Sequence, residues 1–168
     1  MRSIFLSLRP VVLAIGLMMT VALPNLVSAA PAGVPFEASY TGTATFTSAS
    51  TVQFSGAGKA TLLGASTNSG DVVIHGPDGS CPGGLANTNV ETLRAANGDV
   101  LVLTMHDVSC PVGTNVYHGT GRWEVTRGTG RFLGATGQGT IEGDADFNQG
   151  RFAIAMHGTV VLANENSQ

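Results

Sequence analysis

Charged side chains are scarce in this chain, and basic ones are the scarcest. Asp, Glu, Lys and Arg make up 11% of the 168 residues, with eight basic against eleven acidic side chains. Arg2 and Arg9 lie in an N-terminal segment that we expect to be removed, which leaves six basic side chains and a formal charge of −5. Nucleic acid is therefore a poor candidate partner, because its phosphates are bound by clustered Lys and Arg. Low charge does not indicate disorder here, since aliphatic and β-branched residues are spread evenly along the chain.

Cysteine is also rare, because Cys81 and Cys110 are the only two. Each is followed by proline in a turn-like context. In an oxidising compartment pairing is the default, so we predict a disulfide that stabilises the fold by about 3 to 4 kcal/mol. Free thiols and metal ligands are the alternatives. They are disfavoured because no Cys-x-x-Cys pattern and no histidine-flanked spacing occurs.

No motif for nucleotide binding or serine catalysis is complete. The glycine-rich segment 128–134 resembles a phosphate-binding loop, but its final glycine is misplaced for the dinucleotide fingerprint and no Gly-Lys-Ser/Thr follows. Segment 64–68 departs from the nucleophile-elbow pattern at its last position. We therefore expect no cofactor and no serine-hydrolase chemistry.

Titratable side chains lie opposite the apolar residues of their predicted strands. Because side chains alternate across a strand, we expect the four histidines to face solvent and to form no metal site. An acidic stripe on one strand is likewise expected to be a solvated face rather than an acid–base pair, which would need burial or a specific partner. A calcium site is a weak third option for the stripe, since no EF-hand loop is present. These side chains are His75, His106, His118 and His157, and, in the stripe, Glu142, Asp144 and Asp146.

The N-terminal segment has the three-part layout of a secretory signal. Two arginines precede the apolar run 11–23, and small residues follow at 27–30. We predict cleavage after Ala29, which leaves one domain over 30–168 that is secreted or periplasmic and has no stable membrane span. A retained membrane anchor is the alternative, but Pro24 and Asn25 interrupt the apolar stretch near its end.

Alternation of apolar or small residues with polar ones predicts eight β-strands and no helix after the signal. The pair Asn97-Gly98 predicts a tight hairpin turn, because both residues tolerate positive φ. We therefore predict an all-β fold, an eight-stranded antiparallel up-and-down barrel, with a β-sandwich as the alternative. A barrel of eight strands is filled by side chains or holds one small ligand. The predicted strands are 36–46, 52–62, 71–75, 90–95, 99–105, 115–125, 138–147 and 151–162, with a loop over 76–88.

Glycines recur within the strand-like stretch 119–143, which indicates bends and close backbone approach. Residues 124–141 resemble the glycine-rich strand-turn-strand segment of the allene oxide cyclase and dirigent barrel superfamily. The resemblance implies an eight-stranded barrel with an apolar cavity, often a dimer or trimer, in a family that includes cyclases and proteins directing radical coupling. Arg127 departs from the pattern, and the polar cavity residues of the plant cyclases have no clear counterpart here. The matching residues are Thr126, Gly128, Thr129, Gly130, Phe132, Gly134, Ala135 and Gly137, and they imply a structural turn before the seventh strand.

The apolar strand faces are the remaining place for function. Gly119 and Gly121 leave space there for packed rings or for a ligand. Our leading hypothesis is binding of a small apolar or aromatic molecule; a cyclase or isomerase and a structural, self-associating envelope protein are the alternatives. A buried ionisable group lining the cavity would favour the enzyme, and a filled interior would favour the structural protein. The candidate cavity residues are Tyr40, Phe54, Tyr117, Trp123, Phe147, Phe152 and Met156.

Overall fold

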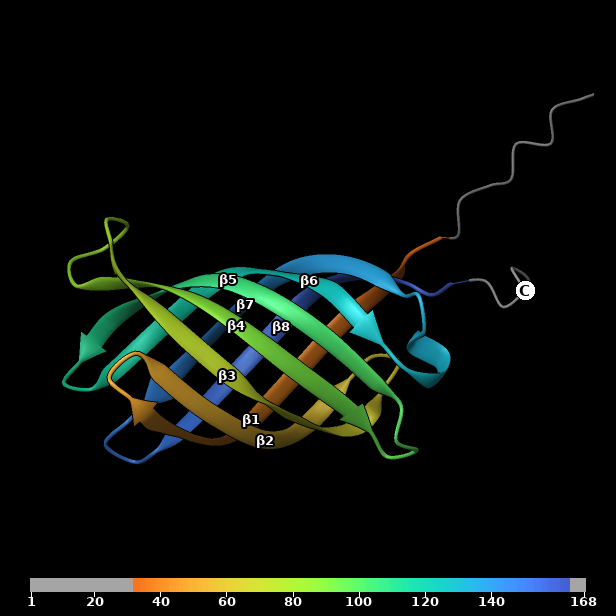
Figure 1. Cartoon of the computed structure of the whole chain (residues 1–168), viewed down its shortest axis with the longest axis horizontal. Helices are drawn as coiled ribbons and strands as arrows, with labels where there is room; N and C mark the ends of the chain where they lie inside the picture. Colours follow the sequence, from red (N-terminus) through yellow and green to blue (C-terminus); the bar gives the residue numbers. More distant parts are fainter. Residues whose placement is uncertain (1–31, 164–168) are drawn as a thin grey trace, which may run out of the picture.

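The computed structural model describes residues 32–163, which form one closed antiparallel barrel (Figure 1). Each strand pairs with the next along the chain, and β1 pairs with β8 to close the sheet. Closure leaves no sheet edge unpaired. The predicted signal segment 1–29 lies outside the described residues. The strands are β1 Val34–Ser48, β2 Thr51–Ala60, β3 Gly64–Asp78, β4 Gly84–Ala95, β5 Val100–Gly113, β6 Val116–Gly128, β7 Thr136–Asp146 and β8 Arg151–Val161, with the 3₁₀ turn η1 Gly130–Phe132 between β6 and β7.

The fold class, the number of strands and their up-and-down order are confirmed, and the sandwich alternative is wrong. The predicted strand bounds are too short for three strands, β3, β4 and β5, and β5 is 14 residues long instead of seven. β3 is 15 residues long instead of five, and the predicted loop 76–88 belongs mostly to β3 and β4. The missing parts of β3 and β4 escaped detection because their inward positions carry polar or small residues, such as Ser66, Asn68 and Asn87, so the apolar alternation is absent there.

One end of the barrel is filled by large side chains. This closed end is where β1 begins and β8 ends, and the η1 turn places the fully buried Phe132 across it. Phe36 meets Trp123 edge-on, with ring centroids 5.3 Å apart. The most deeply buried apolar side chains at this end are Phe36, Leu93, Leu101, Leu103, Met105, Trp123, Phe132, Met156 and Val160.

A pair of glycines makes room for Trp123. Gly139 on β7 and Gly158 on β8 are register partners, and a β-carbon at either would lie 2.6 Å or less from the indole ring. The indole N–H donates to the Thr140 carbonyl oxygen at 3.0 Å. Trp123 therefore packs across bare backbone, a close approach that any larger residue at these two positions would prevent.

The glycine-rich turn before β7 lies at the closed end. Gly130 and Gly134 have φ of +56° and +71°, a conformation that L side chains rarely adopt. A β-carbon at Gly128 would overlap the Phe132 backbone, and one at Gly137 would lie 2.6 Å from the Thr159 carbonyl oxygen. The backbone of this turn thus seats Phe132 in the end of the barrel.

Candidate functional site

The other end of the barrel is hollow. The ends of the strands there surround a cavity of about 140 Å³ with walls that are mainly apolar. A cavity of this size holds a molecule about as large as benzene. Phe46 lies at the mouth and is 47% exposed, so the cavity reaches the surface. The main apolar wall residues are Val52, Phe54, Val72, Ile74, Ile141, Phe152 and Ile154.

The seven candidate cavity residues fall into two groups. Phe54, Tyr117, Phe147 and Phe152 line the cavity. The other three lie below it in the packed core, where they are at most 2% exposed: Tyr40, Trp123 and Met156.

The two glycines between Tyr117 and Trp123 differ in the space around them. Gly119 lines the cavity, and a β-carbon there would lie 3.5 Å from Ser109 Oγ, in ordinary contact. At Gly121 a β-carbon would lie 2.5 Å from the β-carbon of Asp107, so this glycine permits close strand packing. Only the first leaves open space.

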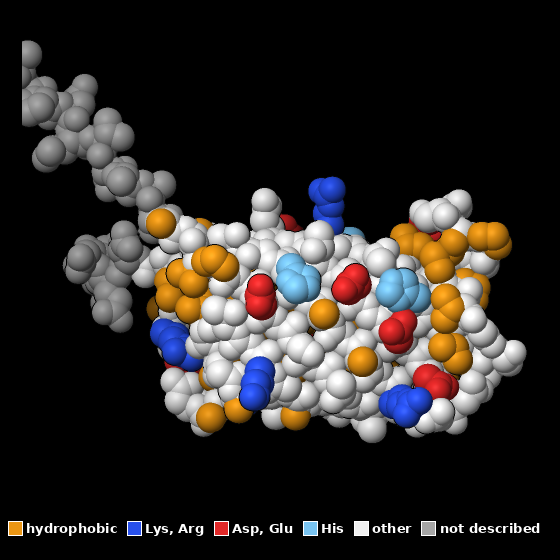
Figure 2. All heavy atoms as spheres, turned by 180° about the vertical axis from the view of Figure 1, so that it is seen from behind, with side chains coloured by type: hydrophobic (Ala, Val, Ile, Leu, Met, Phe, Trp, Pro, Cys, Tyr) orange, Lys and Arg blue, Asp and Glu red, His pale blue; other side chains and the backbone are white. Residues whose placement is uncertain are grey.

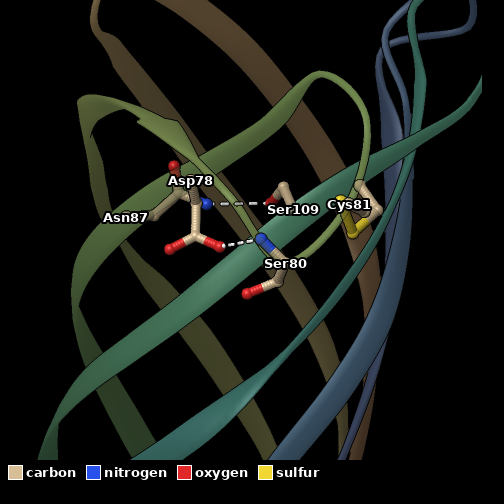
Figure 3. The surroundings of a disulfide bond; sticks show 6 residues. Asp78, Ser80, Cys81, Asn87 and Ser109 are labelled. Atoms are coloured by element: carbon tan, nitrogen blue, oxygen red, sulfur yellow. Dashed lines mark hydrogen bonds between the residues drawn. A yellow bond between two sulfur atoms is a disulfide. The ribbon is translucent and has the colours of Figure 1, made fainter.

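One wall of the cavity is polar, and sequence reasoning missed it. Asn87 and Asn89 project inward from β4, and Asp107 and Ser109 project inward from β5. Asn87 Nδ2 donates to Asp107 Oδ2 at 3.0 Å and to Ser109 Oγ at 2.8 Å. Figure 3 shows the Asn87 amide turned toward Ser109, close to the disulfide. The wall is thus a connected set of amide, carboxylate and hydroxyl groups inside an apolar cavity.

Asp107 is the one half-buried carboxylate of this wall. Burial raises the pKa of Asp107, and hydrogen bonds from Asn87 and Ser109 together with the nearby His106 partly oppose that rise. No Lys or Arg lines the cavity. The wall therefore offers a carboxylate without a basic partner inside the cavity, which can accept hydrogen bonds or exchange a proton.

A second polar group lies deeper, beneath the cavity. Glu91 is fully buried, and its Oε1 accepts a hydrogen bond from Asn68 Nδ2 at 2.8 Å. Burial raises the pKa of Glu91 to about 8, although the Asn68 bond acts in the opposite direction. Tyr40 hydrogen-bonds Ser66 at 2.8 Å, and burial, with the charge of Glu91, raises the pKa of Tyr40.

Four buried side-chain oxygens in the described barrel have no hydrogen-bond partner. Three are the amide carbonyl oxygens of Asn68, Asn87 and Asn89, which can only accept, and the fourth is Oε2 of Glu91, which carries the proton when this acid is protonated. The orientations of Asn68 and Asn87 follow from chemistry, because their NH₂ groups face carboxylates and leave their carbonyl oxygens unpaired. A buried acceptor without a donor is costly, and these three amide oxygens have none.

The predicted disulfide between Cys81 and Cys110 is confirmed. It ties the β3–β4 loop to β5 at the open end, one residue from Ser109 (Figure 3). In the same loop Asp78 accepts a hydrogen bond from the Ser80 N–H at 2.8 Å, and the contacts with Ser80 lower the pKa of Asp78. The bridge therefore holds the strand that carries two of the polar wall residues.

The remaining titratable candidates lie on the outer face or at the rim of the cavity. His75, His106 and His157 are exposed, and His118 pairs at 2.8 Å with Asp144, an exposed residue that borders the cavity. Glu142 is exposed, and the half-buried Asp146 accepts backbone N–H bonds in the β7–β8 turn. Figure 2 shows acidic and histidine side chains following one another along one side of the barrel. Within residues 32–163, no three His, Cys, Asp or Glu side chains come together closely enough to hold a metal ion.

The chain matches no protein-family model, no curated protein and no solved structure. In the part of the chain that the structure describes, no helix has the length and apolar character needed to cross a membrane.

Proposed function

We propose that this protein binds a small apolar or aromatic molecule in the cavity at the open end of the barrel. The observation that carries the proposal is the unequal filling of the two ends: large side chains close one end, and the other holds an apolar cavity with a polar wall. Apolar walls with a few convergent polar groups are the usual composition of ligand sites. The aromatic contacts at the mouth, Phe46 with Phe147 and Phe147 with Tyr117, would cover a ligand that extends outward.

The test combines native mass spectrometry with a cavity-filling variant. The first measurement looks for a molecule retained by the purified protein, and a thermal-shift screen of single-ring and short-chain compounds follows. Gly119→Val is the variant, because a β-carbon at Gly119 has room and the added methyl groups would enter the cavity beside Asp107. Thr120→Val on the outer face of the same strand is the control. We expect Gly119→Val to abolish binding and Thr120→Val to retain it; equal binding by both variants would contradict the proposal.

A cyclase or isomerase is the second candidate, favoured by Asp107. A half-buried carboxylate with a raised pKa on a cavity wall suits proton transfer to a reactive substrate. Such a reaction conserves mass, so the assay is chromatographic separation of isomers after incubation with the molecule found by mass spectrometry. We expect Asp107→Asn to lose conversion at ligand concentrations at which native mass spectrometry still shows the molecule bound. If Asp107→Asn converts the molecule at an unchanged rate, Asp107 takes no part in the reaction.

We also propose that the chain is an exported, distant member of the allene oxide cyclase and dirigent barrel superfamily. Support comes from the closed eight-stranded barrel and from the two positive-φ glycines, Gly130 and Gly134, within the matching turn. The disulfide supports export, since such bonds persist in oxidising compartments. N-terminal sequencing of the protein from the exported fraction tests cleavage after Ala29.

A further inference from the structure

In the polar wall of the cavity, the side-chain atoms without a hydrogen-bond partner are acceptors. Asn87 and Asn89 line the cavity and are 5% and 8% exposed, and the carbonyl oxygen of each lacks a hydrogen-bond donor. The NH₂ group of Asn87 is already used by Asp107 and Ser109. Acceptors therefore outnumber donors in this wall, and a ligand that hydrogen-bonds to it is expected to bring donors.

The charges that line the cavity also favour a ligand that donates hydrogen bonds. Asp107 lines the cavity, and no Lys or Arg lines it to balance the carboxylate. The second carboxylate at the cavity, that of Asp144, pairs with His118 at the surface and adds no positive charge inside. Inside the cavity the carboxylate of Asp107 has no countercharge, and only the charge of His106, on the outer face, partly opposes the cost of its burial, so a cation placed beside it in the cavity would relieve that cost. The other walls carry aromatic rings such as Phe54 and Phe152, whose faces attract cations.

We propose that the cavity ligand is an organic ammonium: an apolar or single-ring body whose protonated amine lies against the carboxylate of Asp107, on the wall that Asn87 and Asn89 share. This inference rests on the proposed binding function and specifies its ligand class. The cavity of about 140 Å³ holds about one ring, and the rest of a larger ligand would extend past the mouth. An anionic ligand is disfavoured, because it would meet a carboxylate and unpaired acceptors with no basic group.

The chain provides reporters inside the site. Ile74, Ile141 and Ile154 are the only isoleucines of the described residues, and all three line the cavity. Methyl labelling of isoleucine therefore gives NMR signals that report directly on the cavity walls. The probes are four compounds with one shared ring and different head groups: benzylammonium, benzyl alcohol, toluene and benzoate. They are titrated into the purified product of the full chain.

We expect benzylammonium to shift these methyl signals with a dissociation constant at least about tenfold below that of benzyl alcohol, with toluene weaker and benzoate without effect. Asp107→Asn should remove the preference for the ammonium while the ring still binds. Asp71→Asn on the outer face of β3 makes the same chemical change away from the cavity and should preserve the preference.

The other outcomes separate the ligand class from the binding function. Equal or tighter binding of benzyl alcohol or toluene would overturn the ammonium inference and leave the binding function standing. Loss of the preference in Asp71→Asn as well would also overturn it, because the selectivity would then come from the overall negative charge. If none of the four probes moves the three methyl signals, both the inference and the proposed function fail.

Discussion

Replacing Glu91 with glutamine should flatten the dependence of stability on pH. Glu91 is fully buried among barrel side chains, and its Oε1 accepts a hydrogen bond from Asn68. The substitution Glu91→Gln keeps the shape and the accepting oxygen of the protonated acid and removes its ability to ionise. At low pH, where the acid is protonated, the variant and the wild type should therefore have similar free energies of unfolding.

The sign and size of the effect follow from the pKa of Glu91. Burial raises this pKa from 4.5 to about 8 in the folded protein, so the folded state favours the protonated acid. The stabilising contribution is fully present below about pH 4.5 and is lost as pH rises through the folded pKa near 8. A tenfold change in the acid's dissociation constant corresponds to about 1.4 kcal/mol, so the wild type should lose about 3 to 4 kcal/mol from this group between pH 5 and pH 8.

The measurement is urea unfolding at pH 5, 6, 7 and 8, followed by the fluorescence of Trp123, the only tryptophan of the chain, buried at the closed end. The useful quantity is the difference in unfolding free energy between Glu91→Gln and the wild type, because the raised pKa of Asp107 affects both proteins equally. Tyr40 titrates above this range, since its pKa is raised from 10. Glu142→Gln, on the exposed face of β7, is the matched control and should follow the wild type. A difference that changes by less than about 1 kcal/mol from pH 5 to pH 8 would refute the reasoning.

Three further predictions concern stability. Replacing Cys81 and Cys110 together by serine should lower the free energy of unfolding by about 3 to 4 kcal/mol, because the two residues are 29 positions apart; a loss below about 1 kcal/mol in urea unfolding would contradict this. Gly130→Ala should cost about 1 to 3 kcal/mol, since φ is +56° and the new β-carbon would overlap a neighbouring aspartate; an unchanged melting temperature would argue against it. Phe132→Ala should cost about 3 to 5 kcal/mol in urea unfolding as the closed end loses its buried ring, whereas Leu133→Ala, at a side chain 67% exposed, should cost almost nothing.

Most of the fold could be predicted from the sequence, because in most of the strands the apolar residues alternate with polar ones. Phe36, Tyr40 and Ala44 alternate with polar residues along β1, and the structure buries all three. Asn97-Gly98 forms the turn between β4 and β5, with Gly98 at φ +91°. Closure of the barrel could not be derived from local patterns, since a sandwich uses the same alternation. It depends on the pairing of β1 with β8, the first and last strands of the chain.

The polar half of the site could not be predicted by the same reasoning. Alternation identifies a buried face by its apolar residues, and β3 to β5 place Asn68, Asn87, Glu91 and Asp107 on that face. The sequence therefore predicts a loop where the barrel wall in fact continues. One signal was available: Asn87, Asn89 and Glu91 occur at every second position, in phase with Leu93. A period of two that continues through polar residues indicates a strand whose inner face has changed character.

The location of these polar groups is unfavourable for stability and supports the proposed binding function. Phe132 and Trp123 fill the closed end, whereas the open end keeps a cavity, and the interior keeps three amide oxygens without a donor, which costs stability. The disulfide from Cys81 to Cys110 spans the same strands that carry the polar wall, so the cross-link stabilises the region where burial is most costly. A ligand in the cavity would offset part of that cost, and the chemistry that the wall offers to it is acceptance of hydrogen bonds and of positive charge.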